Sequence, residues 1–201
     1  MELIFQLAIL IMSVVIHEVS HGYAAYFQGD HTAEYQGRLT LNPIKHIDPV
    51  GSIILPFLLV ITHSPFVIGW AKPVPFNPYN LRFRKWGEAL VAIAGPASNI
   101  FIALVFGLLI RFAGATLSPS FIQIAVIIVI TNLFLAIFNL VPVPPLDGSK
   151  ILFSFFPNQG GSVRIFLEKY SLVFAFIFIF YFSQYLYPIV EMLFRLIAGQ
   201  S

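Results

Sequence analysis

The chain has 201 residues, of which 58% are hydrophobic and only 10% are charged, with a net charge of +2. A soluble domain carries about 25% charged residues, so this composition excludes an ordinary soluble protein. The chain contains no basic run that would suit nucleic acid and no cysteine for disulfides or thiolate metal sites. We predict an all-α integral membrane protein of the cell membrane, folded as one bilayer-embedded domain over residues 1–201.

Four apolar segments are each close to the ~20 residues that a helix needs to cross ~30 Å of hydrocarbon. They are residues 3–26, 89–112, 120–141 and 166–187. The N-terminus "MELIF" lacks the Lys or Arg of a signal peptide. We therefore expect the first segment to be a retained transmembrane helix.

A fifth apolar stretch, residues 50–70, is interrupted by two prolines and leaves two topologies open. If the N-terminus is outside and this stretch does not cross, nine of the eleven Lys and Arg residues face the cytoplasm, as the positive-inside rule favours. We prefer a re-entrant helix at about 50–63 with an extended return through 66–76; the alternative is a fifth span. The Gly and Pro content of 33–42 and 66–76 further predicts a small membrane-associated β element.

The motif His-Glu-x-x-His occupies the second half of the first apolar segment. His17 and His21 are four residues apart and share one face of a helix, where two imidazoles can hold one Zn²⁺. Glu18 lies beside them and can accept a proton from a water molecule at the metal. Ionisable groups within a membrane are costly and are therefore functional by default, so we predict a zinc site.

A catalytic zinc usually has a third protein ligand. The other histidines, His31, His46 and His63, lie in the loop or re-entrant region. Asp147 ends "FNLVPVPPLDG", where three prolines unwind the end of the third span. From spacing alone this carboxylate is either the third ligand or a turn aspartate before Gly148. If it is a ligand, the metal lies towards the cytoplasmic side.

Together, "HEVSH", "AGPASN" and "NLVPVPPLDG" resemble the site-2 protease family of intramembrane zinc metalloproteases, in its small prokaryotic form without PDZ or CBS domains. The resemblance covers nearly the whole chain. It implies zinc bound by His17, His21 and Asp147, with Glu18 as the catalytic base. It also implies that Asn139 contacts the substrate peptide.

Three other polar or small positions have structural interpretations. Asn132 is interpreted as an interhelical hydrogen-bonding residue, as most membrane asparagines are. In "AGPASN", Gly95 is expected to permit close helix packing and Asn99 to be structural.

These features predict a zinc-dependent endopeptidase that cuts membrane-spanning protein substrates near the cytoplasmic side. The main alternative is a zinc or proton-coupled transporter that uses the same His and Asp residues. Transporters often contain repeated halves, and none is evident here. An inactive scaffold is a further alternative, against which the intact ligand set and base argue. The sequence indicates no oligomeric state.

Overall fold

Four helical segments of the computed structural model are long and apolar enough to cross a membrane. The structure describes residues 2–62, 69–156 and 161–199. The four segments are Ile4–Phe27 within α1 (Glu2–Phe27), Gly87–Thr116 containing α4 (Gly87–Ala113), Pro119–Leu140 (α5), and Ser171–Ala198, which includes α8 (Ser171–Ile177) and α9 (Leu186–Ala198). An all-helical membrane protein with four such helices is confirmed.

The fourth long segment differs from its predicted bounds of 166–187. A separate polar helix, α7 (Gly161–Lys169), precedes it, and the segment then continues to Ala198 through a π-helical turn, Phe178–Phe182. Hydropathy alone does not locate the two ends of this segment, because apolar residues lie on both sides of each end. The segment extends to Ala198 because α9 packs against α4 and α5.

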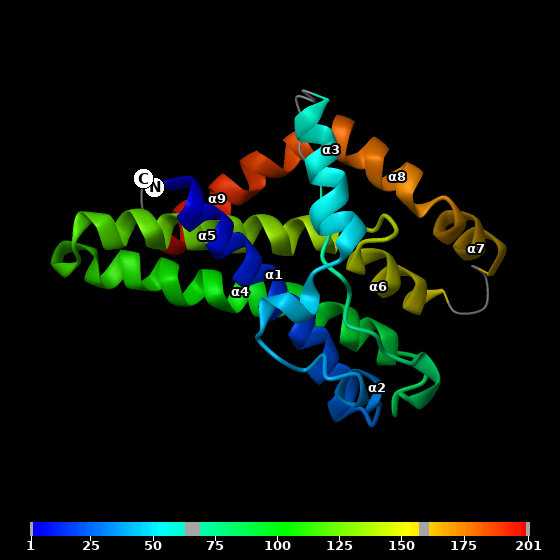
Figure 1. Cartoon of the computed structure of the whole chain (residues 1–201). Coiled ribbons are helices and arrows are strands. Elements are labelled where there is room, and N and C mark those ends of the chain that lie inside the picture. The colour runs from blue at the N-terminus through cyan, green and yellow to red at the C-terminus, as the bar shows by residue number, and fades with distance from the viewer. Residues whose placement is uncertain (1, 63–68, 157–160, 200–201) are drawn as a thin grey trace.

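The long helices are arranged around α4, which contacts α1, α5, α6 and α9. In Figure 1, α4 and α5 lie side by side over most of their lengths, and α1 crosses them obliquely. Small side chains at the contacts allow the helix backbones to approach closely. The largest buried cluster joins α4, α5 and α9 and consists of Ala103, Ile110, Ala125, Val129, Leu133, Val190, Phe194 and Ala198.

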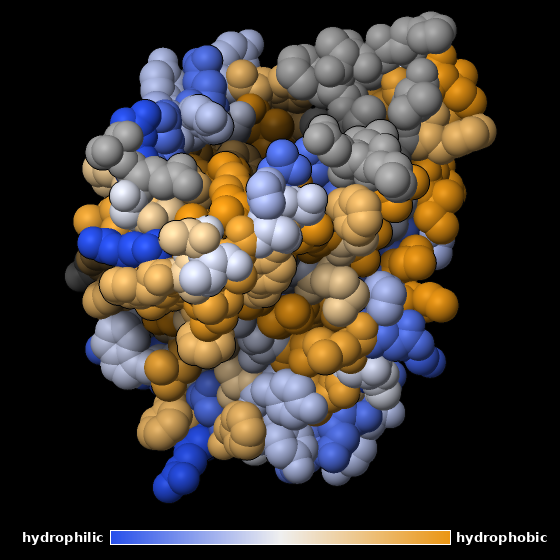
Figure 2. Space-filling view, turned by 90° about the vertical axis from the view of Figure 1, so that its left-hand side faces the viewer, coloured by the Kyte–Doolittle hydropathy of each residue, from blue (hydrophilic) through white to orange (hydrophobic). Residues whose placement is uncertain are grey.

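The outer surface is largely apolar, as a bilayer requires. Hydrophobic residues cover much of the face in Figure 2, and the most hydrophilic residues lie mainly towards its margins. Phe101 and Phe112 on α4 are 67% and 80% exposed. Such large exposed aromatic side chains would be unfavourable in water but suit contact with lipid.

The helices described between α1 and α4, over residues 28–62 and 69–86, are all short. They are α2 (Thr32–Tyr35), two 3₁₀ helices (Pro43–His46 and Pro78–Asn80), a π-helix (Pro49–Ile54) and α3 (Leu55–Ile61). The continuous helix 49–61 rises only ~20 Å at 1.5 Å per residue, too little to cross the bilayer. The remainder of the 50–70 stretch includes residues 63–68, which lie outside the described residues, so the choice between re-entry and crossing stays a prediction.

The predicted β element is wrong for the described residues, which contain no strand. Residues 70–77 form neither helix nor strand, and the prolines at 73 and 75 have no N–H to donate to a ladder. The other bonded N–H groups do not donate to one neighbouring strand. Their hydrogen bonds run from Trp70 to Gly51, from Lys72 to His46, from Val74 to Glu18 and from Asn77 to Asp30. These residues are called the 70–77 segment below.

The chain reverses sharply between α5 and α6 (Asp147–Phe155). The prolines after Leu140 end α5, because they cannot continue its hydrogen bonding. A Cβ at Gly148 would overlap the carbonyl of Leu140, so only glycine lets the start of α6 lie against the end of α5. This contact carries Asp147 back towards the bundle.

Asp30 connects the end of α1 to the residues that precede α4. It is fully buried, and its carboxylate accepts hydrogen bonds from the Thr32 hydroxyl (2.6 Å), the Asn77 N–H (2.6 Å) and the Asn80 amide (2.9 Å). Burial alone would raise the pKa of Asp30, but these hydrogen bonds together hold it below its ordinary value. The ionised carboxylate therefore stabilises the fold.

We predict that Asp30→Asn lowers the stability of the protein at pH 7 by about 1–3 kcal/mol, because the amide cannot accept all of these bonds. Since the folded pKa is depressed, the stabilisation is complete above the unfolded pKa of ~3.9 and is lost as the pH falls through the folded value. Thermal unfolding is followed by intrinsic fluorescence at pH 7 and at pH 4 and below. The difference in stability between wild type and Asp30→Asn should become smaller in acid. The control is Glu34→Gln, an exposed carboxylate nearby. Equal melting of wild type and Asp30→Asn at pH 7 would contradict the prediction.

Candidate metal centre

Three buried side chains converge where α1 meets the start of α6. His17 and His21 of α1 and Asp147 of α6 are 5%, 9% and 6% exposed. The Nε2 atoms of both histidines lie 3.1 Å from Oδ2 of Asp147. The structure thus brings together the three residues that the sequence predicted as metal ligands.

The orientation of His21 is set by a backbone carbonyl of α4. Its Nδ1 lies 2.7 Å from the carbonyl oxygen of Val91. A carbonyl can only accept a hydrogen bond, so Nδ1 carries the proton and donates. In the neutral imidazole, Nε2 then keeps its lone pair and faces Asp147.

The orientation of His17 is set by a chain of buried amides. Asn132 donates from Nδ2 to the carbonyl of Ile128 (2.9 Å), which fixes its amide, so its Oδ1 accepts from Nδ2 of Asn99 (2.8 Å). The oxygen of Asn99 therefore faces Nδ1 of His17 at 2.6 Å. His17 donates from Nδ1, and its Nε2 is also free to bind a cation.

The arrangement of these atoms fits a divalent metal ion. Two imidazole lone pairs and a carboxylate oxygen face one another, and such acceptors repel unless a cation lies among them. Tetrahedral zinc ligands at ~2.0–2.1 Å lie ~3.3 Å apart, close to the 3.1 Å separations here. His17, His21 and Asp147 would hold the zinc, and a fourth position would be left for water or substrate.

Gly95 of α4 leaves space beside the ligand atoms. A Cβ at this position would lie 2.5 Å from Nε2 of His21 and 2.6 Å from Nε2 of His17. Any larger residue would therefore occupy the volume next to both lone pairs. Glycine was expected here for close helix packing, but its position indicates a more specific role in leaving room for an ion.

The predicted base lies beside the ligands and contacts a different part of the chain. Glu18 is half-buried, and its Oε2 accepts a hydrogen bond of 2.8 Å from the N–H of Val74. Lys150, one turn into α6, places its Nζ 3.5 Å from Oδ1 of Asp147. Glu18 is thus adjacent to the centre without belonging to its ligand set.

The remaining candidate residues are not among the three converging side chains of the described residues. Asn139 is half-buried and donates to the carbonyl of Leu135 in its own helix (2.9 Å), so its contact with a substrate stays a prediction. His31 pairs with Glu34, and buried His46 contacts the carbonyl of Thr40. His63 lies outside the described residues.

The part that α4 plays at this centre was not predicted from the sequence. Asn99 was interpreted as structural, but it fixes the orientation of a metal ligand. The Gly-Pro-x-x-Asn pattern was a signal, since it places Gly95 and Asn99 one turn apart on the same face. Val91 gave no signal, because it acts through its backbone carbonyl. The hydrogen bond that Asn132 accepts from Asn99 confirms the predicted interhelical role of Asn132.

Comparison with known proteins agrees with this geometry. Residues 108–182 match the family described as peptidase family M50. The chain is 39% identical over 191 residues to "Putative zinc metalloprotease YwhC" of Bacillus subtilis, covering 90% of this chain and 84% of that protein. It is 35% identical over 141 residues to "Putative zinc metalloprotease Rip2" of Mycolicibacterium smegmatis, covering 69% of this chain and 52% of that protein. No solved structure gave a significant match.

The match to the Bacillus protein extends over most of both chains, and 39% identity over that length shows a shared family. The His-Glu-x-x-His helix and the Asp147 turn of this chain supply the three converging side chains. The chain therefore belongs to peptidase family M50, a family of zinc metalloproteases, and is a membrane protein of that family.

Proposed function

We propose that this protein is an endopeptidase that hydrolyses peptide bonds of membrane-spanning protein substrates, near the cytoplasmic side of the membrane. The observation that carries the proposal is the buried His17, His21 and Asp147 cluster, which lies inside a bundle of apolar helices next to Glu18. A soluble substrate would not require metal ligands on a transmembrane helix. A peptide bond that lies in the membrane would require them there.

The depth of the centre supports the choice of side. His17 lies 13 residues after Ile4, or ~20 Å along the first span. Asp147 follows the C-terminal end of α5. His17 and Asp147 therefore meet near the membrane surface at which both α1 and α5 end. Most Lys and Arg residues lie in the two connections at this surface, 28–86 and 141–170. The positive-inside rule makes this the cytoplasmic side and places the N-terminus outside.

Each residue at the centre has a separate task in the proposed reaction. A bound zinc would polarise the scissile carbonyl and make water acidic enough to lose a proton near neutral pH. Glu18 accepts that proton and returns it to the leaving amine. Asn99 and the Val91 carbonyl keep the two imidazoles oriented. Asn139 is proposed to contact the substrate backbone.

The substrate must unwind before it can react. A transmembrane helix keeps its carbonyls in i→i−4 hydrogen bonds and covers them with side chains. Substrates with helix-breaking residues near the cytoplasmic surface are therefore expected to be cut fastest, because unwinding costs them least.

The first prediction tests the metal centre. Purified protein should contain about one zinc per chain by mass spectrometry of the metal, and His17→Ala should lose most of it. Gly95→Ala should also lose zinc, although Ala is a better helix former than Gly by roughly 0.5–1 kcal/mol. The control is Gly114→Ala, where an added Cβ meets nothing within 4 Å. Full zinc occupancy in His17→Ala would show that the metal binds elsewhere.

The second prediction separates a protease from a transporter. Glu18→Gln keeps its size but cannot accept a proton, so it should retain zinc and cut a tagged single-span protein at no more than ~1% of the wild-type rate. Asn139→Leu should retain zinc and cut more slowly through poorer substrate positioning. Cleavage is followed on gels with protein in liposomes. Unchanged cleavage by Glu18→Gln would refute the mechanism, and zinc flux that survives the substitution would favour transport.

The third prediction concerns topology. Since the chain has no native cysteine, single cysteines can be labelled with a membrane-impermeant maleimide. Cysteines replacing Tyr35, Tyr79 and Val163, which are 84%, 95% and 59% exposed, should react only from the cytoplasmic side. One replacing Ala115 should react only from outside. If positions 35 and 79 react from opposite sides, the 50–70 stretch crosses the membrane.

A further inference from the structure

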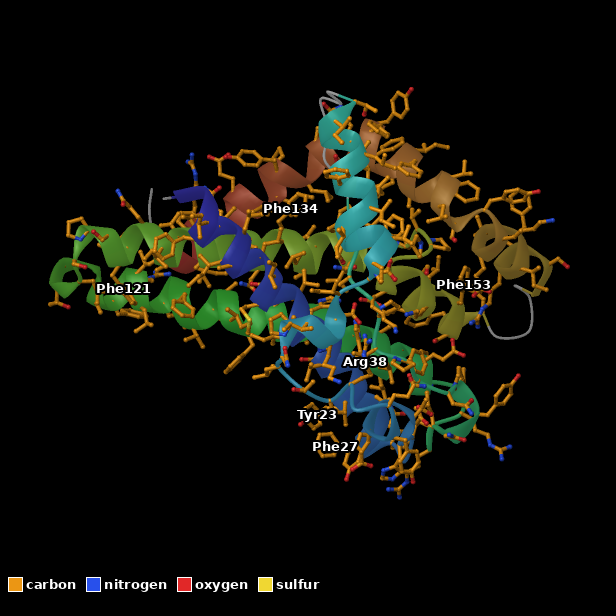
Figure 3. All side chains as sticks on the ribbon, in the orientation of Figure 1. Tyr23, Phe27, Arg38, Phe121, Phe134 and Phe153 are labelled. Carbon is orange, nitrogen blue, oxygen red and sulfur yellow. The ribbon has the colours of Figure 1, made fainter. Side chains whose placement is uncertain are left out.

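A buried arginine holds the 70–77 segment beside the proposed base. Arg38 is 6% exposed, and its Nη2 donates to the carbonyl oxygens of Lys72 (2.7 Å) and Pro73 (3.3 Å). Figure 3 labels Arg38 next to the second half of α1. Two consecutive carbonyls of the segment are thus bound by one guanidinium.

The surroundings of Arg38 are unusual for a buried cation. None of the ion pairs among the described residues includes it. Its Nε is buried and has no hydrogen-bond partner within the described part of the chain. A buried charge that lacks a carboxylate partner is costly. Stability alone is therefore a poor explanation for an arginine at this position.

The residue that follows the two bound carbonyls contacts Glu18. Val74 donates its N–H to Oε2 of Glu18 at 2.8 Å. Pro73 has a fixed φ angle, so the positions of the bound carbonyls restrict the direction of the next N–H. The side chain of Val74 also packs on α1, since a Cβ at Gly22 would lie 2.8 Å from its Cγ1.

The opposite side of the segment is fixed as well. The N–H of Lys72 donates to the carbonyl of His46 (2.8 Å), and Trp70 donates to Gly51 (3.1 Å). Arg38 therefore completes a set of contacts that leaves the Val74 N–H little freedom.

We propose that Arg38 is a positioning residue for the carboxylate of Glu18, acting through the backbone of residues 72–74. The inference rests on the proposed role of Glu18 as the base. Glutamate is flexible, and catalysis requires its carboxylate to be held within ~0.5 Å of the productive position. Because Oε2 is bound to the Val74 N–H, we assign proton acceptance to Oε1.

The test compares Arg38→Met and Arg38→Lys with Arg84→Met, which removes an exposed arginine from the same connection. The probe is a tagged single-span protein with an Asn-Pro pair near the cytoplasmic end of its transmembrane helix, presented in dodecylmaltoside micelles. Arg38→Met should lower kcat about 10–100-fold, the effect of a misplacement of ~1 Å, with KM changed less than about threefold and zinc content unchanged. Arg38→Lys should recover part of kcat, because an ammonium can still donate to these carbonyls. Arg84→Met should behave as wild type.

A double-mutant cycle separates positioning from general support of the fold. In the Glu18→Gln background, Arg38→Met should lower the residual rate by less than about twofold, because the group that it positions is already gone. Hydrogen exchange of the peptide containing Val74 should also be faster in Arg38→Met than in wild type. A structural role would reduce the rate equally in both backgrounds.

The possible results test the role of Arg38 separately from the proposed function of the protein. Wild-type kcat in Arg38→Met, or equal losses in the two backgrounds, would overturn the role of Arg38. If Arg38→Met does not fold, the same cycle is run with Arg38→Lys and judged by the same criterion. A wild-type protein that leaves the probe uncut would count against the proposed function instead.

Discussion

A polar group buried among apolar helices must find a partner inside the protein, because lipid offers none. This requirement determines how α1, α4 and α6 meet. The first helix carries two histidines that cannot face hydrocarbon at low cost. Each has one ring nitrogen bonded to α4 and the other directed towards Asp147 of α6. The metal centre and the packing of these helices are thus parts of one arrangement.

Helix α4 contributes no ligand, but its residues orient the ligands and leave space beside them. Asn99 and the carbonyl of Val91 determine which nitrogen of each histidine carries the proton, and Gly95 leaves the adjoining space. Ring orientation and tautomer are properties that second partners impose on metal-binding histidines. An M50 protein with both motifs intact but a changed α4 would therefore still have the ligands and lack their geometry.

The proposed base is held by a different kind of element. Glu18 shares a helix with the metal ligands, yet its carboxylate is bonded to the backbone of the 70–77 segment. The prolines of that segment exclude a regular sheet and stiffen the chain. The ligands are thus held by packed helices and the proposed base by the 70–77 segment.

Local properties of the sequence determined the first three spans and the two histidines of the candidate metal centre. Hydropathy and length suffice for such spans, and predicted segments such as 3–26 match the helices closely, here Ile4–Phe27. Four-residue spacing placed both histidines on one face. For Asp147, spacing left a choice between ligand and turn residue. The structure favours the ligand, because Gly148 brings α6 against the end of α5.

Only the tertiary structure decided which groups support these residues. The carbonyl of Val91 and the N–H of Val74 act through the backbone, which every residue possesses, so no residue type marks them in a sequence. The guanidinium of Arg38 is bonded to carbonyls 34 and 35 residues away. Contacts between such distant segments depend on how the chain folds back on itself, and the pattern of nearby residues does not contain that information.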